Sequence, residues 1–537
     1  MSGLDARIAE VEKGPTGPSI GAFFDFDGTL IAGYSATVFY LDRLRKRQVS
    51  PREIASTLIA GAEMGLRGAD VGGLMRIAAQ AMAGHSEDEL SELGQRLFVQ
   101  RIAGMVYPEA RELVRAHQRA GHTLVLASSA TPYQAAPLAS DLGFDHLLTS
   151  RVEVVRGIIT GRVLGPVLWG EGKANAVREF AQRHGVDLAA SYGYANGDED
   201  VPFLESVGLP RPLNPQDGLR RMAMRRGWPI VRFASRGRPG VEQLVRTGAA
   251  LTGLGVAGAV GLGLGLLNGS RRDAANLATS VGSDVALALA GVRLNVTGEE
   301  HLWSHRPAVF IFNHQSSMDV PIVANLVRRD LTGVAKIEAS RDPRFALLGY
   351  VAQVAYVDRG NTAQARAALE PAVEKLRSGV SLAISPEGTR SVTPRLGRFK
   401  KGAFHLAMQA GVPVVPIVIR NAGEVMWRGS FLVRPGTVDV VVLPPVPTAG
   451  WRVEDLPRHI ADLERRYRAT LDDWPDGGSR ELAGRARRRA PAAAEVEVAV
   501  EPPAGNGAAS APVRRRAPRS PRRTSPRSAG ASTSSSE

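Results

Sequence analysis

A histidine is followed by an aspartate, with four residues between them, just after an apolar run in the middle of the chain. The run is residues 309–312, and the two residues are His314 and Asp319, separated in part by a pair of serines. We expect a strand, then a helix begun by a serine, so that the turn folds the carboxylate back towards the imidazole. Histidine can take a proton from a hydroxyl group near neutral pH, and a neighbouring carboxylate orients it. The alternative is that the serine caps the helix and Asp319 only complements the helix dipole.

Other apolar runs in the same half of the chain also end in residues suited to binding an anion. One run ends at Arg359, another ends in Pro-Glu-Gly-Thr-Arg at 386–390, and residues 412–417 contain two prolines among valines. Arginine presents a planar fork that matches phosphate oxygens, and glycine lets the backbone come close to a ligand. A serine or cysteine nucleophile is unnecessary if the hydroxyl group of a bound acceptor attacks.

In this order, the segments between residues 295 and 450 resemble the four sequence blocks of the glycerolipid acyltransferases, in particular the 1-acylglycerol-3-phosphate acyltransferases. The resemblance implies acyl transfer from acyl-CoA or acyl-carrier protein to the free hydroxyl of lysophosphatidic acid, giving phosphatidic acid. It implies that His314 is the general base and that Asp319 orients it. It also implies an acceptor site made of Arg359, Glu387, Gly388, Thr389 and Arg390. Another lysophospholipid or a glycolipid stays open as the acceptor.

A second pair of acidic residues lies near the N-terminus. Asp25 and Asp27 follow an apolar run at 21–24 and precede Gly28 and Thr29. Carboxylates at alternate positions of a strand end point the same way and can share a cation. One can attack phosphorus while the other handles the proton of the leaving oxygen. The alternative is an acidic turn that contains a glycine.

The Asp-x-Asp-Gly-Thr string resembles the haloacid dehalogenase superfamily, and within it the phosphoserine-phosphatase-like branch. The resemblance implies that Asp25 is the nucleophile that accepts the phosphoryl group, that Asp27 is the general acid/base, and that Mg2+ is required. It places the phosphate-binding serine at Ser129 and the phosphate-neutralising lysine at Lys173.

One position departs from this family's pattern. Anchoring on Asp-x-Pro-x-Leu puts Asp200 at the second acidic position of the fourth motif and Asn196 at the first. The expected metal-binding set is Asp25, Asp27, Asn196 and Asp200. Asparagine can bind Mg2+ through its carbonyl oxygen but adds no charge, so we expect weaker binding. The N-terminal segment is therefore either a weak or specialised phosphomonoesterase or a regulatory or scaffold module.

Composition sets outer bounds on these interpretations. A chain of 537 residues predicts two or three domains. There are no cysteines, which excludes disulfides and thiolate nucleophiles. The formal charge is +14, about half of it near the C-terminus. The remaining, mildly basic surface suits anionic lipid and phosphorylated substrates, and no nucleic-acid partner is expected because no such motif is present.

The alternation of apolar runs with helical periodicity indicates an α/β protein. We expect a disordered lead-in at 1–20, a Rossmann-like hydrolase domain at 21–235 with a helical cap at about 33–105, apolar helices at 241–290, an acyltransferase domain at 291–473 and a disordered basic tail at 475–537. The cap should contain helices near 37–46 and 88–102.

The uncharged stretch 247–268 is long enough to span a bilayer and is rich in glycine. Three interpretations remain open: a transmembrane helix, a re-entrant or interfacial hairpin, and a buried helix. Because the expected acceptor and product are lipids, we expect the chain at the cytoplasmic side of the cell membrane. The oligomeric state is not fixed by the sequence.

Overall fold

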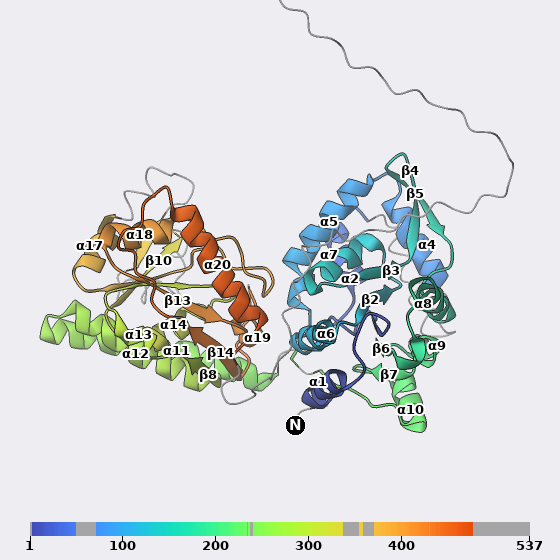
Figure 1. Ribbon diagram of the computed structural model, residues 1–537, viewed down its shortest axis with the longest axis horizontal. Coiled ribbons are helices and arrows are strands. Elements are labelled where there is room, and N and C mark those ends of the chain that lie inside the picture. The colour runs from blue at the N-terminus through green and yellow to red at the C-terminus, as the bar shows by residue number, and fades with distance from the viewer. Residues whose placement is uncertain are drawn as a thin grey trace, which may run out of the picture. The chain divides into compact units, whose positions relative to one another are not determined.

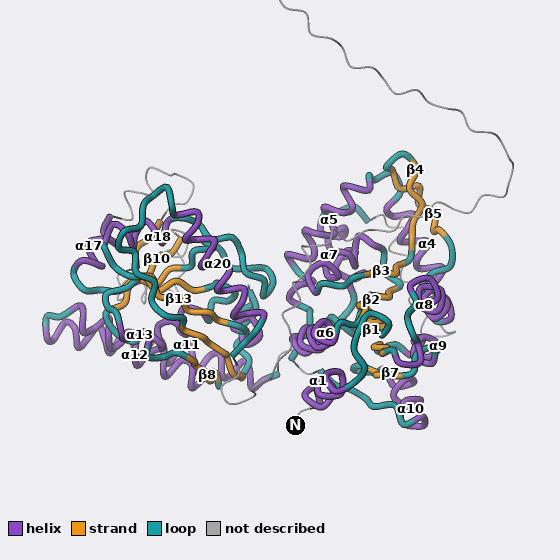
Figure 2. The backbone as a smooth tube through the Cα atoms, viewed as in Figure 1, coloured by secondary structure: helices purple, strands orange, loops and turns teal. Residues whose placement is uncertain are grey.

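The computed structural model describes residues 3–49, 71–233, 235–236, 240–336, 354–357, 370–428 and 430–475. Arg359 and residues 476–537 of the expected basic tail lie outside the described residues. The described chain contains two large β-sheets, each with helices on both faces (Figures 1 and 2). The expected α/β class is therefore confirmed.

The N-terminal sheet has five strands in the order β3-β2-β1-β6-β7, and all neighbouring pairs are parallel. The strands are β1 (Gly21–Phe24), β2 (Thr123–Ser128), β3 (His146–Thr149), β6 (Tyr192–Ala195) and β7 (Leu209–Pro212). Parallel strands bring their carboxyl ends to one edge of a sheet, which is where ligands bind in such folds. The segments after β1, β2 and β6 therefore meet at this edge.

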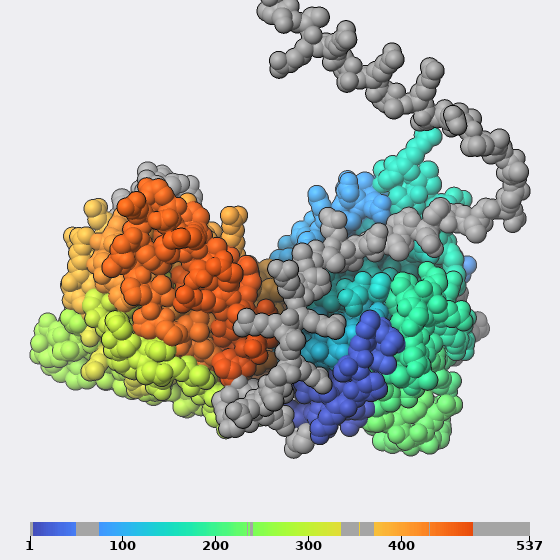
Figure 3. Space-filling view, viewed as in Figure 1, coloured from blue at the N-terminus to red at the C-terminus, as the bar shows by residue number. Residues whose placement is uncertain are grey.

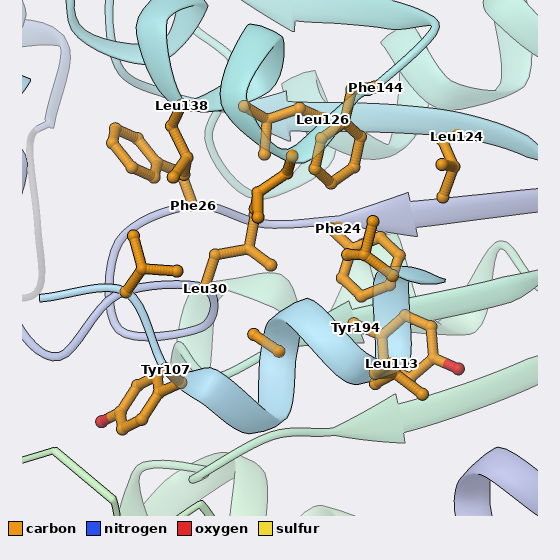
Figure 4. Packing of buried hydrophobic residues seen from close by; sticks show 14 of the residues in the cluster. Phe24, Phe26, Leu30, Tyr107, Leu113, Leu124, Leu126, Leu138, Phe144 and Tyr194 are labelled. Carbon is orange, nitrogen blue, oxygen red and sulfur yellow. The ribbon is translucent and has the colours of Figure 1, made fainter. Parts of the chain in front are cut away.

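Helices cover both faces of this sheet and explain why β1 is an unbroken apolar run. Phe24 stacks on Tyr194 on the side of α6 and α7, as Figure 4 shows for the surrounding cluster. Phe23 packs edge-on against Phe180 of α8 on the other side. The helices are α6 (Pro108–Ala120), α7 (Pro132–Leu142) and α8 (Glu171–His184), with the shorter α9 (Val201–Glu205) and α10 (Asp217–Arg226) near the sheet edge.

The expected cap is helical where it is described. The helices expected near 37–46 and 88–102 correspond to α2 (Ser35–Arg45) and α5 (Glu87–Gln100), with α4 (Val71–Met82) between them. Ser86 begins α5 with a reciprocal capping box to Glu89, which explains the position of its first turn. The hairpin of β4 (Arg151–Val155) and β5 (Ile158–Leu164) packs on α4.

The structure differs from the disordered lead-in that was expected at 1–20. Residues 3–13 form helix α1 (Gly3–Lys13), which packs against α6. Leu4, Ile8 and Val11 recur at helical spacing, and Val11 is almost fully buried. The apolar face is short and lies in a polar segment, so it is stabilised by the partner helix rather than by its own propensity.

The C-terminal sheet has seven strands in the order β11-β10-β12-β9-β13-β14-β8. The strands are β8 (Val292–Thr297), β9 (Val309–Phe312), β10 (Leu331–Lys336), β11 (Ala355–Val357), β12 (Ser381–Ile384), β13 (Val414–Ile419) and β14 (Gly436–Val442). Only the β13–β14 pair among these described strands is antiparallel. Because β9 lies between the parallel strands β12 and β13, the segments that follow these three strands meet at one edge.

Alternate residues of β9 face two different apolar clusters. Val309 and Ile311 pack with α17, α18 and α20, whereas Phe310 and Phe312 pack with α12 and α14 (Figure 1). The helices are α12 (Arg271–Ala290), α14 (Asp319–Val327), α17 (Glu370–Arg377), α18 (Gly402–Ala410) and α20 (Leu456–Asp472), with short turns at α13 (His301–Ser304) and α19 (Ala422–Val425). This double burial holds the strand that precedes His314 rigidly in place.

The apolar stretch forms α11 (Val241–Asn268), which packs along α12 as a helical hairpin (Figure 1). The green to yellow-green surface of this segment lies open along one side of the C-terminal domain (Figure 3). A Cβ atom on Gly265 would lie 2.5 Å from the Cβ of Ala274, so glycine is what permits this close approach. By length and composition this helix is able to cross a membrane. Its other face is exposed, with Leu266 at 78% and Leu267 at 85%, which does not fit the interpretation as a buried core helix.

Candidate functional sites

His314 and Asp319 meet at the carboxyl end of β9. Asp319 begins α14, and its Oδ2 lies 2.7 Å from Nδ1 of His314. The aspartate is fully buried, whereas the histidine side chain keeps 22% of its exposed surface. The turn expected from the sequence therefore brings the carboxylate to the imidazole, and the histidine ring stays partly exposed.

The same turn holds Asp319 through its own backbone. Oδ2 also accepts hydrogen bonds from the backbone N–H groups of Gln315 and Ser316 at 2.7 and 2.8 Å. The hydroxyl of Ser316 accepts a hydrogen bond from the N–H of Met318. Of the two alternatives considered from the sequence, the histidine contact is present and the serine cap is not. The N-cap residue of α14 is Met318, which makes no side-chain capping hydrogen bond.

The side chain of Asn313 was not singled out from the sequence, yet it joins this loop to the sheet. Its Nδ2 donates to the carbonyl of Ile419 and its Oδ1 accepts from the N–H of Ile419, both at 2.7 Å. The side-chain amide therefore forms the same pair of hydrogen bonds as a strand backbone would, and it extends the pairing of β9 with β13 by one residue. The sequence signal was an asparagine directly before the histidine at a strand end.

The sequence predicts Glu387 in the acceptor site, but its side chain is turned into the protein. It is buried, and its Oε1 accepts the backbone N–H of His314 at 2.8 Å. Its Oε2 accepts from the hydroxyl of Ser391 and the N–H of Gly397. Burial raises the pKa of Glu387, and these hydrogen bonds act against that rise. Its carboxylate faces into the protein and joins the Pro-Glu-Gly-Thr-Arg loop to the histidine loop.

The rest of that loop presents a surface beside the histidine. Gly388 has φ +75°, and a Cβ there would lie 3.1 Å from Nζ of Lys400. Thr389 is exposed. Arg390 is half-buried and donates from Nη1 to the hydroxyl of Ser317 at 2.7 Å. Gly388, Thr389 and Arg390 therefore share one loop at the open side of the site.

In the N-terminal part, Lys173 joins two of the expected acidic residues. Its Nζ lies 2.8 Å from Oδ1 of Asp25 and 2.6 Å from Oδ1 of Asp200, and all three side chains are buried. Burial lowers the pKa of Lys173, but the two carboxylates outweigh burial and raise it. Burial has the opposite effect on an acid: it raises the pKa of Asp200, and the positive charge of Lys173 limits that rise. Lys173 comes from the first turn of α8, far away in sequence.

Thr29 links Asp25 to Asn196. Its hydroxyl lies 3.1 Å from Oδ2 of Asp25 and 3.1 Å from Oδ1 of Asn196. Gly28 has φ +79°, and a Cβ there would lie 2.2 Å from Nδ2 of Asn196. Only glycine lets the backbone turn past the asparagine at this distance.

Asp27 faces the start of the cap helix α2. One carboxylate oxygen accepts from the N–H of Ser35 at 2.7 Å and the other from its hydroxyl at 2.9 Å. Burial raises the pKa of Asp27 to about 7, even though these hydrogen bonds lower it. Its carboxyl group therefore fits the acid/base role better than the metal-binding role that was also expected. No spacing in the sequence pointed to Ser35.

Ser128 and Ser129, at the carboxyl end of β2, differ in how far they are exposed. Ser128 is buried, and its hydroxyl accepts the N–H of Ala130 within the same turn. Ser129 is partly exposed. This geometry favours Ser129 as the residue whose hydroxyl is available to a ligand.

The oxygen atoms around Asp25 fit a hard cation such as Mg2+, which we expect to bind with reduced affinity. No group of three His, Cys, Asp or Glu side chains suited to a metal ion occurs among the residues that the structure describes. Asn196 stands there in place of an acid, although its amide oxygen Oδ1 and the carboxylate oxygen Oδ2 of Asp25 both accept from the hydroxyl of Thr29. Asp198 does not substitute, because its Oδ1 accepts the N–H of Leu219 at the start of α10. The donor set of Asp25, Asn196 and Asp200 suits Mg2+ with one charge fewer.

Comparison with known families matches both parts. The model of the haloacid dehalogenase-like hydrolases matches residues 22–205, and the model of the acyltransferases matches residues 293–420. The N-terminal part is 37% identical over 244 residues to phosphoserine phosphatase SerB1 of Mycobacterium tuberculosis, covering 44% of this chain and 79% of that protein.

The C-terminal part is 34% identical over 193 residues to a 1-acyl-sn-glycerol-3-phosphate acyltransferase of Limnanthes alba, covering 36% of this chain and 68% of that protein. The crystal structure of the acyltransferase PlsC from Thermotoga maritima aligns with a TM-score of 0.39 and 24% identity, covering 45% of this chain and 97% of that one. The two family models and the sequence relatives confirm the resemblances seen in the motifs. The chain belongs to two families, with a haloacid dehalogenase-like hydrolase domain followed by an acyltransferase domain of the 1-acyl-sn-glycerol-3-phosphate acyltransferase family.

Proposed function

We propose that the C-terminal domain transfers an acyl chain to the free hydroxyl of 1-acylglycerol 3-phosphate and so makes phosphatidic acid. The observation that carries this proposal is the 2.7 Å contact between Nδ1 of His314 and the fully buried Asp319. With Nδ1–H donated to the carboxylate, Nε2 holds the lone pair that takes a proton.

The proposed reaction needs no covalent enzyme intermediate. Nε2 of His314 removes the proton of the acceptor hydroxyl, and the oxygen attacks the thioester carbonyl of acyl-CoA or acyl-carrier protein. The C–S bond breaks, the new ester C–O bond forms, and the thiolate leaves and takes a proton from the imidazolium. Asp319 stabilises the imidazolium, and Arg390 lies beside the base, where a phosphate would hold the acceptor. Arg359, Gly388 and Thr389 complete the proposed acceptor site.

We further propose that the N-terminal domain hydrolyses a phosphomonoester. Asp25 attacks phosphorus, Asp27 protonates the leaving oxygen and then activates water, and Lys173 and Ser129 hold the phosphate. Asp25, Asn196 and Asp200 would hold Mg2+, which neutralises phosphate charge when bound. The buried Asp25–Lys173–Asp200 group supports an enzymatic role over a scaffold role, because a scaffold has no use for buried charge.

We also propose that α11 and α12 dock the protein on the cytoplasmic surface of the membrane as an interfacial hairpin. Gly253, Gly261 and Gly265 of α11 face α12, whereas Leu266 and Leu267 are exposed. α12 is itself anchored to the folded domain by the ion pairs Arg272–Asp330 and Asp284–Arg328. A helix fixed along its length to the enzyme suits a position at the interface better than an isolated span.

One preparation tests both activities, because each variant is the control for the other. Membranes containing the full chain are assayed for phosphatidic acid from lysophosphatidic acid and acyl-CoA or acyl-carrier protein, and for Mg2+-dependent release of phosphate from a phosphomonoester panel. We expect His314→Ala to lose only acyl transfer and Asp25→Asn to lose only phosphate release.

Two outcomes would change the assignment. If folded wild-type protein gives no phosphatidic acid with either donor but acylates another lysophospholipid or a glycolipid, the acceptor assignment is wrong. If the panel releases no phosphate in wild-type protein, the N-terminal domain is a regulatory or scaffold module.

A further inference from the structure

We infer that Arg428 is a second phosphate-binding arginine of the acyl-acceptor site, acting together with Arg390. This inference rests on the proposed acyl transfer and names a residue outside the four sequence blocks. Arg428 lies in the loop after α19, between β13 and β14. It is partly exposed, so its guanidinium is accessible to a ligand.

Two loops that are distant in sequence converge on adjacent serines beside the proposed base. Arg390 donates to the hydroxyl of Ser317 at 2.7 Å. The hydroxyl of Ser316 donates to the carbonyl of Met426 at 2.5 Å, two residues before Arg428. The loop that carries Arg428 is therefore attached to the same turn that carries His314 and Asp319.

The charges of the two arginines act on each other. Burial lowers the pKa of Arg390, and the positive charge of Arg428 lowers it further, by more than the Asp319 carboxylate raises it. Neither guanidinium forms an ion pair with a carboxylate in the part of the chain that the structure describes. Two neighbouring cations repel each other, so binding of a phosphate dianion between them removes an unfavourable contact.

A phosphomonoester matches this pair in charge and shape. Two guanidinium forks can bind three phosphate oxygens through charge-assisted hydrogen bonds. Both the acceptor and coenzyme A carry phosphate groups. We assign the pair to the acceptor, because Arg390 is hydrogen-bonded to Ser317 in the turn that carries His314 and Asp319. The acceptor hydroxyl must lie next to the same turn to reach the base.

The test compares Arg428→Gln and Arg428→Lys with Arg458→Gln, which removes an exposed arginine of α20. All variants are made in the full chain, and their melting temperatures are compared first. We expect Arg428→Gln to raise the KM for lysophosphatidic acid at least about tenfold, corresponding to about 1.4 kcal/mol, with kcat and the KM for acyl-CoA nearly unchanged. Arg428→Lys should recover part of the loss, and Arg458→Gln should match wild type.

A second measurement does not depend on turnover. Calorimetric titration with glycerol 3-phosphate, which carries the acceptor's headgroup, should show weaker binding to Arg428→Gln than to wild type. An unchanged KM for lysophosphatidic acid, or a rise only in the KM for acyl-CoA, would overturn the inference. Failure of wild-type protein to acylate lysophosphatidic acid while it still binds glycerol 3-phosphate through Arg428 would instead overturn the proposed reaction.

Discussion

The carboxylate of Glu387 accepts the backbone N–H of His314 at 2.8 Å, so the two motifs expected to form the acyltransferase site are joined through a buried side chain. The contact is reciprocal, because the N–H of Ser391 donates to the carbonyl of His314 at 2.6 Å. The position of the proposed base is thus fixed from the Pro-Glu-Gly-Thr-Arg loop. We therefore propose that Glu387 is a positioning residue and not an acceptor-binding one.

Glu387→Gln should reduce kcat and leave the KM for lysophosphatidic acid unchanged. An amide NH2 would face an N–H donor at one of the two oxygen positions, which moves the His314 loop. A displacement of about 1 Å at a reacting group costs up to about a hundredfold in rate, so we expect a fall in kcat of about ten- to a hundredfold.

Steady-state kinetics beside Glu374→Gln, an exposed glutamate of α17, provide the comparison. A raised KM for the acceptor with normal kcat would return Glu387 to the acceptor site that the sequence suggested.

Asp319→Asn should lower kcat by about a hundredfold or more. Oδ2 of Asp319 takes the contacts from Nδ1 of His314 and from both backbone N–H groups. An asparagine that keeps its oxygen there loses the negative charge that stabilises the imidazolium, and one that turns its NH2 there faces three N–H donors. The matched control is Asp284→Asn on α12, which breaks an exposed ion pair worth less than about 1 kcal/mol. Equal activity of the two variants, measured on folded protein, would rule out the orienting role.

Asn196→Asp should strengthen Mg2+ binding by the N-terminal domain. The substitution restores the missing negative charge beside Asp25, and a carboxylate binds Mg2+ better than an amide carbonyl does. We expect the Mg2+ dissociation constant to fall by about tenfold, measured by calorimetry and by the Mg2+ needed for half-maximal phosphate release. Asn175→Asp, on the exposed side of α8, controls for added charge. No change in Mg2+ affinity would remove Asn196 from the metal site.

A buried chain of two histidines and a tyrosine should make the N-terminal domain sensitive to acid. His122 Nε2 donates to the carbonyl of Pro15, so its Nδ1 accepts from His117 Nδ1, and His117 Nε2 accepts from the hydroxyl of Tyr194, each at 2.8 Å. Burial lowers the pKa of both histidines, far more for His117. Protonation of either ring breaks an internal hydrogen bond.

Because the folded pKa values lie below the unfolded ones, this stability is present above about pH 6.5 and falls as the pH drops below it, by up to about 1.4 kcal/mol per pH unit for each histidine. Urea unfolding of this domain in the full chain, followed at about pH 7.5 and about pH 5.5, measures the loss. The double variant His117→Gln/His122→Gln should flatten the dependence, and the exposed His85→Gln should not. A pH dependence that is unchanged in the double variant would contradict the assignment.

Leu266→Ser/Leu267→Ser should weaken binding to vesicles of phosphatidylcholine and phosphatidylglycerol. Burial of each leucine is worth about 1.5–3 kcal/mol, so their loss should lower the partition coefficient by about tenfold or more. Val453→Ser removes an exposed apolar side chain elsewhere in the same domain and should bind like wild type. Vesicle flotation gives the comparison, and equal flotation of all three proteins would contradict docking through α11.

The sequence by itself determined both families and the edge of each sheet where chemistry is placed. Three site residues directly follow apolar runs: His314, Glu387 and Asn196. Such runs form parallel strands, and the carboxyl ends of neighbouring parallel strands meet at one edge of the sheet. Local rules also predicted the turn that joins His314 to Asp319, although the N-cap of α14 is Met318 and not the expected serine.

The tertiary structure decided which way the long side chains point. Glu387 turns inward because buried N–H groups need an acceptor, and Asp27 turns to Ser35 for the same reason. The approach of the Arg428 loop to the Arg390 loop depends on two segments that are far apart in the chain and bond to the adjacent Ser316 and Ser317. Periodicity and spacing report local geometry, whereas these contacts arise only when distant loops pack and their polar groups must be satisfied together.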